Sequence, residues 1–135
     1  MSATPRRVAI INDASAYVGP DLARALAARG HDLVLGDPVD GLAAELEATG
    51  ATVVSVAGAR NLAKEESSQR LVAAALERFG RVDAAAAATG QIVVGRFVKS
   101  SVADLERVYR GCIEAPYHFL RTIVPVMIEQ GGGQV

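Results

Sequence analysis

Three glycines divide the chain into a repeating unit in which a helix-forming stretch ends in glycine and a short, mostly apolar run follows. The glycines are Gly30, Gly50 and Gly80, and the runs that follow them are 31–35, 51–56 and 81–88. Glycine directly after a helix adopts the left-handed backbone conformation at low cost, so its position is typical of a helix end. Strands that alternate with helices in this way form right-handed βαβ units. The repeat therefore predicts an α/β fold with a doubly wound parallel sheet.

The residues around these glycines predict four strands and four helical segments in one domain over 1–135. The strands are expected at 7–11, 31–35, 51–56 and 84–88, and Gln134-Val135 is expected to start a fifth. The helices are expected at 20–29, 39–49, 62–79 and 101–130, with Asp40, Asn61 and Ser101 as N-terminal caps. The alanines at 84–88 favour a helix by propensity, and only their place in the repeat favours a strand. The polar first half of 62–79 should be exposed, and Pro116 and Pro125 should kink or split the last helix.

Composition excludes several classes of protein. A hydrophobic content of 50% with a net charge of -1 predicts a folded globular domain and gives no reason to expect a nucleic-acid or membrane partner. Cys112 is the only cysteine, so a disulfide framework and a cysteine zinc site are excluded. His31 and His118 lie far apart in the sequence without further ligands, so we expect no metal site. A reducing, cytoplasmic location fits best.

The turn after the first strand, residues 12–19, is the strongest candidate for a ligand site. In a parallel sheet, ligands bind outside the carboxyl ends of the strands, and the start of the next helix offers N–H groups that suit a pyrophosphate. The usual fingerprint has three glycines, of which only Gly19 is present. Asp13 adds negative charge and Tyr17 adds bulk to this turn. A plain strand–helix turn without a ligand is the alternative interpretation.

Asp37 follows the second strand and lies 18 residues after Gly19. An acid at about this distance can bind the ribose hydroxyls of a dinucleotide, and it repels the additional phosphate of NADP. Asp37 therefore favours NAD over NADP. A turn aspartate before Pro38 is an equally good interpretation from the sequence.

The run 8–19 resembles the first strand and turn of the short-chain dehydrogenases/reductases, whose pattern is Thr-Gly-x-x-x-Gly-x-Gly. Asn12 stands at its Thr, Asp13 and Tyr17 stand at its first two glycines, and Gly19 stands at its third. Residues 82–90 resemble the segment that ends Asn-Asn-Ala-Gly, with Ala87 and Ala88 at the two Asn positions and a match only at the final glycine. Ala57 stands where the family places an Asp near the adenine. The resemblance covers the whole chain in order and implies a Rossmann-like fold.

The resemblance also implies which residues hold a dinucleotide cofactor. They come from the first turn, the end of the second strand, the loop after the third strand and the end of the fourth. These residues are Asn12, Asp13, Ala14, Ser15, Tyr17, Val18, Gly19, Asp37, Ala57, Gly58, Ala88, Thr89 and Gly90.

The family's catalytic residues do not map onto this chain. Cys112 stands at the position of the family's helix Asn, and on an apolar helix face it is interpreted as a small buried hydrophobe. The family's Ser and its Tyr-x-x-x-Lys pair follow the fifth strand, and none of the tyrosines here has Lys four residues later. Tyr117 has Arg121 at that spacing and is interpreted as a helix-packing residue. We therefore expect the cofactor-binding part of a longer dehydrogenase, which ends before the catalytic segment.

Three other expectations follow. The resemblance implies an NAD(P)-dependent oxidoreductase that acts on an alcohol or carbonyl, and a dinucleotide-binding pseudoenzyme without catalysis is the alternative. A phosphoacceptor receiver domain fits poorly, because Ala57 stands where that chemistry needs an Asp. The long apolar face of helix 101–130 is expected to pair subunits in a homo-oligomer.

Overall fold

The computed structural model describes residues 4–135 and contains one parallel sheet of four strands in the order β3-β2-β1-β4. The strands are β1 (Arg7–Ile11), β2 (His31–Gly36), β3 (Val53–Val56) and β4 (Ala84–Ala86). Gln134 forms a parallel bridge with Ala84, which confirms the predicted start of a fifth strand beside β4. The doubly wound α/β prediction is therefore confirmed.

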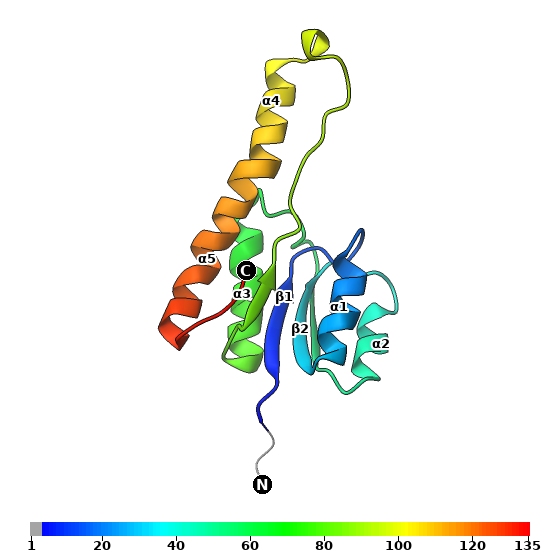
Figure 1. The fold of residues 1–135 in the computed structure, drawn as a ribbon, viewed down its shortest axis with the longest axis vertical. Coiled ribbons are helices and arrows are strands. Elements are labelled where there is room, and N and C mark those ends of the chain that lie inside the picture. The colour runs from blue at the N-terminus through cyan, green and yellow to red at the C-terminus, as the bar shows by residue number, and fades with distance from the viewer. Residues whose placement is uncertain (1–3) are drawn as a thin grey trace.

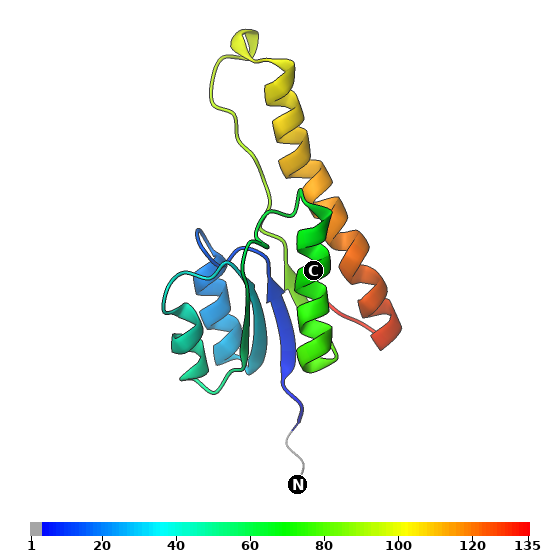
Figure 2. The ribbon, with the colours of Figure 1, turned by 180° about the vertical axis from the view of Figure 1, so that it is seen from behind.

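Helices cover both faces of the sheet (Figure 1). On one face lie α1 (Gly19–Ala28) and α2 (Leu42–Glu47), and on the other lie α3 (Glu65–Phe79) and α5 (Ala115–Gln130). Each face has its own apolar core because the strand residues alternate between the two sides: Ala9 and Ile11 pack toward α1, whereas Val8 and Ile10 pack toward α3 and α5. Figure 2 shows α3 and α5 side by side from behind.

The segment from 91 to 109 extends beyond the carboxyl edge of the sheet as an arm (Figure 1). It consists of an extended loop, a short 3-10 turn at η1 (Phe97–Lys99) and α4 (Val102–Tyr109). Ser101 caps α4, because its hydroxyl accepts from the Asp104 N–H while the Asp104 carboxylate accepts from the Ser101 N–H. This reciprocal capping box confirms the predicted start of the helix.

The last helix is split once and not twice. A π-helical turn, η2 (Arg110–Glu114), separates α4 from α5 directly before Pro116. Proline clashes with the carbonyl four residues earlier, and the wider π turn removes that clash. Pro125 was expected to kink or split the helix as well, but it does not split it. α5 continues through Pro125 because Phe119, Ile123 and Met127 are buried along one face on both sides of the proline.

Several predicted boundaries were wrong by a few residues, and each error has a local cause. The helix expected at 39–49 is only α2, because Gly41 takes a left-handed conformation at its start, and Asp40 is therefore not its cap. The helix expected at 62–79 starts at Glu65 with Lys64 as its cap, while Asn61 caps a preceding turn by accepting from the Ala63 N–H. The strands expected at 51–56 and 84–88 are shorter because Asp32 and Asn12 bind the Thr52 and Ala88 N–H groups.

The charged and amide residues in the first half of α3, Glu65, Glu66, Gln69 and Arg70, are exposed as expected. Ser67 and Ser68 are buried, which the expectation did not include. Within residues 4–135, no helix is long and apolar enough to cross a membrane.

Candidate cofactor site

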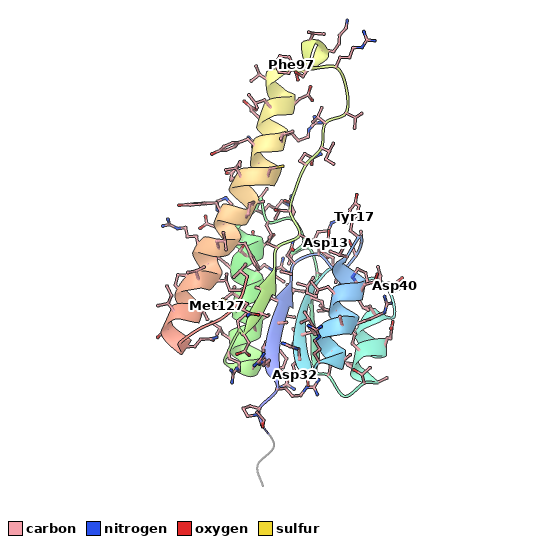
Figure 3. The ribbon with its side chains drawn as sticks, viewed as in Figure 1. Asp13, Tyr17, Asp32, Asp40, Phe97 and Met127 are labelled. Atoms are coloured by element: carbon pink, nitrogen blue, oxygen red, sulfur yellow. The ribbon has the colours of Figure 1, made fainter. Side chains whose placement is uncertain are left out.

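In the turn between β1 and α1, Tyr17 has a backbone conformation that is typical of glycine. Tyr17 has a φ of 52°, in the left-handed region that disfavours L side chains. Its side chain is 95% exposed and points away from the molecule (Figure 3). The bulky Tyr17 side chain is therefore directed into solvent and does not fill the turn. The backbone follows the path that a glycine would take.

Gly19 allows α1 to begin directly against this turn. A Cβ atom at residue 19 would lie 2.0 Å from the carbonyl oxygen of Asp13, which no rotamer could relieve. The glycine that the sequence retains is thus the one that the close helix–strand packing requires. Sequence reasoning missed a second such position: a Cβ atom at Gly36, the last residue of β2, would lie 1.9 Å from the Asn12 carbonyl oxygen.

Free backbone N–H groups lie directly before α1, whereas the Gly19 N–H donates to the Ala16 carbonyl at 3.2 Å. In the described part of the chain, the Tyr17 and Val18 N–H groups donate to no protein acceptor, and no side chain caps the helix. Such donors, at the positive end of a helix, suit a phosphate. Together with the backbone conformation at Tyr17 and the close approach at Gly19, they fit the pyrophosphate of a dinucleotide.

Other predicted residues of the turn have internal roles. Ala14 is buried, and its backbone donates to Gly36 and accepts from Val39. Asp13 accepts both the Ser15 N–H (3.0 Å) and the Ser15 hydroxyl (2.5 Å) on one carboxylate oxygen. The Ser15 N–H therefore donates to Asp13 and is not free to bind a ligand.

Asn12 connects the ends of two strands and a loop. Its side chain is fully buried, accepts from the Ala88 N–H at 2.6 Å, and donates to the carbonyls of Arg60 (2.9 Å) and Ala88 (3.0 Å). The amide thus fixes the loop after β3 and the end of β4 relative to β1. Asn12 shapes the site without exposing a polar atom to it.

Asp37 follows β2 with a φ of 45° and faces the loop after β3. Its two carboxylate oxygens accept from the Gly58 N–H (2.6 Å) and the Arg60 N–H (2.9 Å). Partial burial raises the pKa of Asp37, but these hydrogen bonds and the nearby Arg60 charge outweigh burial and hold the pKa below its ordinary value. The carboxylate is therefore ionised at neutral pH, and each oxygen retains a lone pair for a further donor.

A cleft of about 940 Å³ lies between the strand ends and the start of the last helical segment. Four of the predicted residues line it: Asp13, Ala88, Thr89 and Gly90. Residues that were not predicted line it as well, among them Arg60, Lys64, Gln91, Arg107 and Arg110. The β4 end meets α4–α5 here because Gly111 leaves room, since a Cβ atom there would lie 2.6 Å from the Gln91 Cβ. Ala57 and Gly58 are not in the lining, and the Ala57 carbonyl accepts from Arg70 at 2.7 Å.

Cys112 lies in the π-helical turn η2 and is exposed, so its interpretation as a buried hydrophobe was wrong. Its thiol accepts from the Gln91 N–H at 3.4 Å, which ties η2 to the loop after β4. Tyr117 is 55% exposed and accepts from Arg121 at 3.0 Å, so it does not pack inside the domain. Nothing in the described structure gives either residue a proton-transfer partner at the cofactor turn.

The parallel sheet, the free N–H groups before α1 and the acid after β2 are features of dinucleotide-binding domains. The chain belongs to the short chain dehydrogenase family, whose model matches residues 7–135. The receiver-domain alternative is therefore wrong.

Among its relatives is a (2S)-[(R)-hydroxy(phenyl)methyl]succinyl-CoA dehydrogenase subunit from Thauera aromatica, which is 35% identical and covers 96% of this chain. An L-rhamnose 1-dehydrogenase (NAD(P)(+)) from a Sphingomonas species is 26% identical over 94% of the chain. The chain spans about half the length of these relatives, 52% and 51%.

Solved structures of dehydrogenases share the fold. An alcohol dehydrogenase from Thermococcus sibiricus complexed with 5-hydroxy-NADP has a TM-score of 0.83 and 28% identity over 95% of this chain and 56% of its own. A 3-oxoacyl-[acyl-carrier protein] reductase from Brucella melitensis in complex with NAD has a TM-score of 0.79 and 25% identity over 93% of this chain and 51% of its own.

Proposed function

We propose that this chain binds a nicotinamide adenine dinucleotide at the carboxyl edge of its sheet, as the cofactor-binding part of an NAD(P)-dependent oxidoreductase. The turn from Asn12 to Gly19 carries the proposal, because it keeps a glycine-like path and presents open N–H groups although two family glycines are missing. When bound, the cofactor supplies hydride transfer to a carbonyl or from an alcohol.

The residues of this chain would bind and orient that cofactor. The Tyr17 and Val18 N–H groups would hold the pyrophosphate and Asp37 the ribose. The backbone of Ala57-Gly58 would border the adenine, and residues 88–90 would lie along the ribose. The chain contains no Tyr-x-x-x-Lys pair, so catalysis is proposed for the whole protein. The second candidate is a non-catalytic dinucleotide-binding protein, which the departures at Asp13, Ala87 and Cys112 favour. This second candidate predicts that the whole protein binds the dinucleotide but does not catalyse hydride transfer.

NAD is the proposed cofactor in preference to NADP. Similar structures hold either NAD or 5-hydroxy-NADP, so the fold alone does not decide. Asp37 supports NAD, because an ionised carboxylate accepts hydrogen bonds from the two ribose hydroxyls and repels a 2′-phosphate. A cytoplasmic location is proposed as well, since an exposed free thiol such as Cys112 is stable in reducing surroundings.

Replacing Asp37 tests both cofactor binding and cofactor choice. We expect Asp37→Ala to weaken NADH binding about 10- to 100-fold, because a charge-assisted hydrogen bond is lost, and to leave NADPH binding unchanged or tighter. Both affinities are measured by isothermal titration, with a thermal melt to verify folding. Asp40→Ala is the control, since this exposed acid lies three residues further along the same loop (Figure 3). An equal loss for both cofactors would contradict the ribose role, and no NADH binding by the unaltered chain would contradict the proposed function.

We also propose that a second copy of the chain packs on the α4–α5 stripe, the exposed apolar residues along one side of these helices. Its members are spaced three or four residues apart: Tyr109, Ile113, Tyr117, Leu120, Val124 and Ile128. A contiguous apolar patch of this kind marks an interface. In a symmetric dimer, each substitution is present twice.

Leu120→Glu should therefore raise the dimer dissociation constant about 100-fold or more, because burial leaves two unpaired carboxylates. Sedimentation velocity measures the change. Val98→Glu, which alters an exposed residue in the arm, should leave the dimer intact. A monomeric wild-type chain at tens of micromolar would rule out the proposed pairing.

A further inference from the structure

Arg60 is held at the cofactor turn by two different strand ends. Its N–H donates to the Asp37 carboxylate at 2.9 Å, after β2, and its carbonyl accepts from the Asn12 side chain at 2.9 Å, after β1. These two bonds fix the backbone of the loop after β3, so the start of the Arg60 side chain has a defined position. Arg60 also lines the 940 Å³ cleft together with Asp13 and residues 88–90.

The Arg60 side chain spans the opening between this loop and the β1–α1 turn. Its Nη1 donates to the Ser15 hydroxyl at 3.4 Å, which is a long and weak hydrogen bond. The guanidinium has no salt bridge among residues 4–135 and is exposed. A charged group with one weak partner has most of its donors available for a stronger acceptor.

Asp13 makes the turn less favourable for a phosphate, and a nearby positive charge would offset this effect. Asp13 stands at the first glycine position of a turn in which phosphate binding depends on neutral backbone and free N–H groups. Its carboxylate adds a negative charge, and it also takes the Ser15 N–H at 3.0 Å. Relative to a glycine at this position, the turn therefore loses a donor and repels a phosphate.

We propose that Arg60 is the cofactor-binding residue that compensates for Asp13, by donating from its guanidinium to the pyrophosphate of the dinucleotide. This inference rests on the proposed function. The guanidinium donates to the Ser15 hydroxyl, which in turn donates to the Asp13 carboxylate, so its positive charge lies near the negative charge of Asp13. Arginine suits this role because its planar fork binds phosphate oxygens in pairs.

The Arg60 guanidinium is better placed to bind the pyrophosphate than a 2′-phosphate on the ribose. Asp37 accepts from the backbone of Arg60 itself, so a phosphate on the ribose would lie beside an ionised carboxylate. The Arg60 guanidinium reaches the turn, where the Ser15 hydroxyl accepts from it at 3.4 Å.

Competition binding with phosphate-containing and phosphate-free ligands tests the assignment. In this experiment NADH is first bound to the 135-residue chain. ADP, adenosine or 2′-AMP is then added, and the loss of NADH fluorescence measures how well each ligand displaces it. We expect Arg60→Ala to weaken ADP binding about 10- to 100-fold, to leave adenosine binding unchanged and to reduce the dependence of ADP binding on salt. Arg60→Lys should recover part of the loss, and adding Asp13→Asn to Arg60→Ala should recover more of it.

Arg70→Ala is the matched control, because Arg70 is an exposed arginine that bonds the same loop at the Ala57 carbonyl, 2.7 Å away. Equal ADP binding by Arg60→Ala and the wild-type chain would overturn the assignment and leave the proposed function intact. A larger loss for 2′-AMP than for ADP would also overturn it, in favour of the 2′-phosphate. A wild-type chain that binds neither NADH nor ADP would overturn both. Thermal melts verify that the variants fold.

Discussion

Gly19→Ala should unfold much of the chain and abolish dinucleotide binding. The added methyl group would lie 2.0 Å from the Asp13 carbonyl oxygen and 3.0 Å from the Ala14 Cα, both of them backbone atoms. No side-chain rotation can relieve this contact, so α1 must move away from β1. Its buried face, which includes Ala23 and Ala27, would then lose contact with the sheet. We expect a loss of about 3 kcal/mol or more in the free energy of unfolding.

Gly30→Ala separates this clash from the general cost of replacing a glycine. Gly30 has a φ of 83°, and an added methyl group there would have no other atom within 4 Å, so only backbone strain of about 1 kcal/mol is expected. Urea unfolding followed by circular dichroism measures both variants, and NADH titration measures binding where the chain remains folded. Equal destabilisation by the two substitutions would show that the close approach of α1 to the turn is not important for stability.

The order of strands and helices could be predicted because local chemistry and tertiary structure agree at the helix ends. Gly30, Gly50 and Gly80 all have φ values between 72° and 91°, as the repeat predicted. The alanine run shows the limit of local propensity. Ala84–Ala86 form a strand because they pair with Ala9, Ile10 and Ile11 in the sheet, and this pairing outweighs the helix preference of alanine.

The candidate site was only partly predictable, because its geometry depends on contacts between distant segments. The turn and Asp37 follow from motif spacing. By contrast, Tyr17 takes a glycine-like conformation that its residue type disfavours, and only the surrounding fold imposes it. Arg60 was missed because its importance comes from bonds to Asp37 and Asn12, which lie 23 and 48 residues away. Ser67 and Ser68 are buried by α3 packing, which polar residue types do not predict.

Asn12→Leu should cost about 3–5 kcal/mol of the free energy of unfolding. The amide side chain is fully buried and makes three hydrogen bonds, two to Ala88 and one to the Arg60 carbonyl. Leucine has the same branched shape, with two larger methyl groups in place of the amide oxygen and nitrogen, and it satisfies none of these bonds. Each buried group left without a partner costs about 1–3 kcal/mol. Because these bonds fix the loop that carries Arg60 and the end of β4, dinucleotide binding should weaken as well. Chemical unfolding and NADH titration measure the two effects.

Two further variants distinguish lost hydrogen bonds from lost packing. Asn12→Thr supplies one donor and one acceptor, so it should recover roughly half of the loss. Asn12→Asp keeps the shape and the acceptor for Ala88 but directs a carboxylate at two carbonyl oxygens. Repulsion and burial should raise the folded-state pKa of the introduced carboxyl above its unfolded value of about 3.9. The penalty is then complete above the raised pKa and disappears as the pH falls through it toward the unfolded value.

Asn61→Ala is the control for these variants, because the exposed Asn61 accepts only a local bond from the Ala63 N–H and should cost less than about 1 kcal/mol. Stability of Asn12→Asp that does not depend on pH, relative to the wild-type chain, would show that the amide donors at residue 12 are not needed. In that case the pairing of β1 with β4, the bonds from the loop after β3 to Asp37, and packing would be enough to hold these segments together. The expected pH dependence would instead identify Asn12 as the polar connection that holds the candidate site in shape.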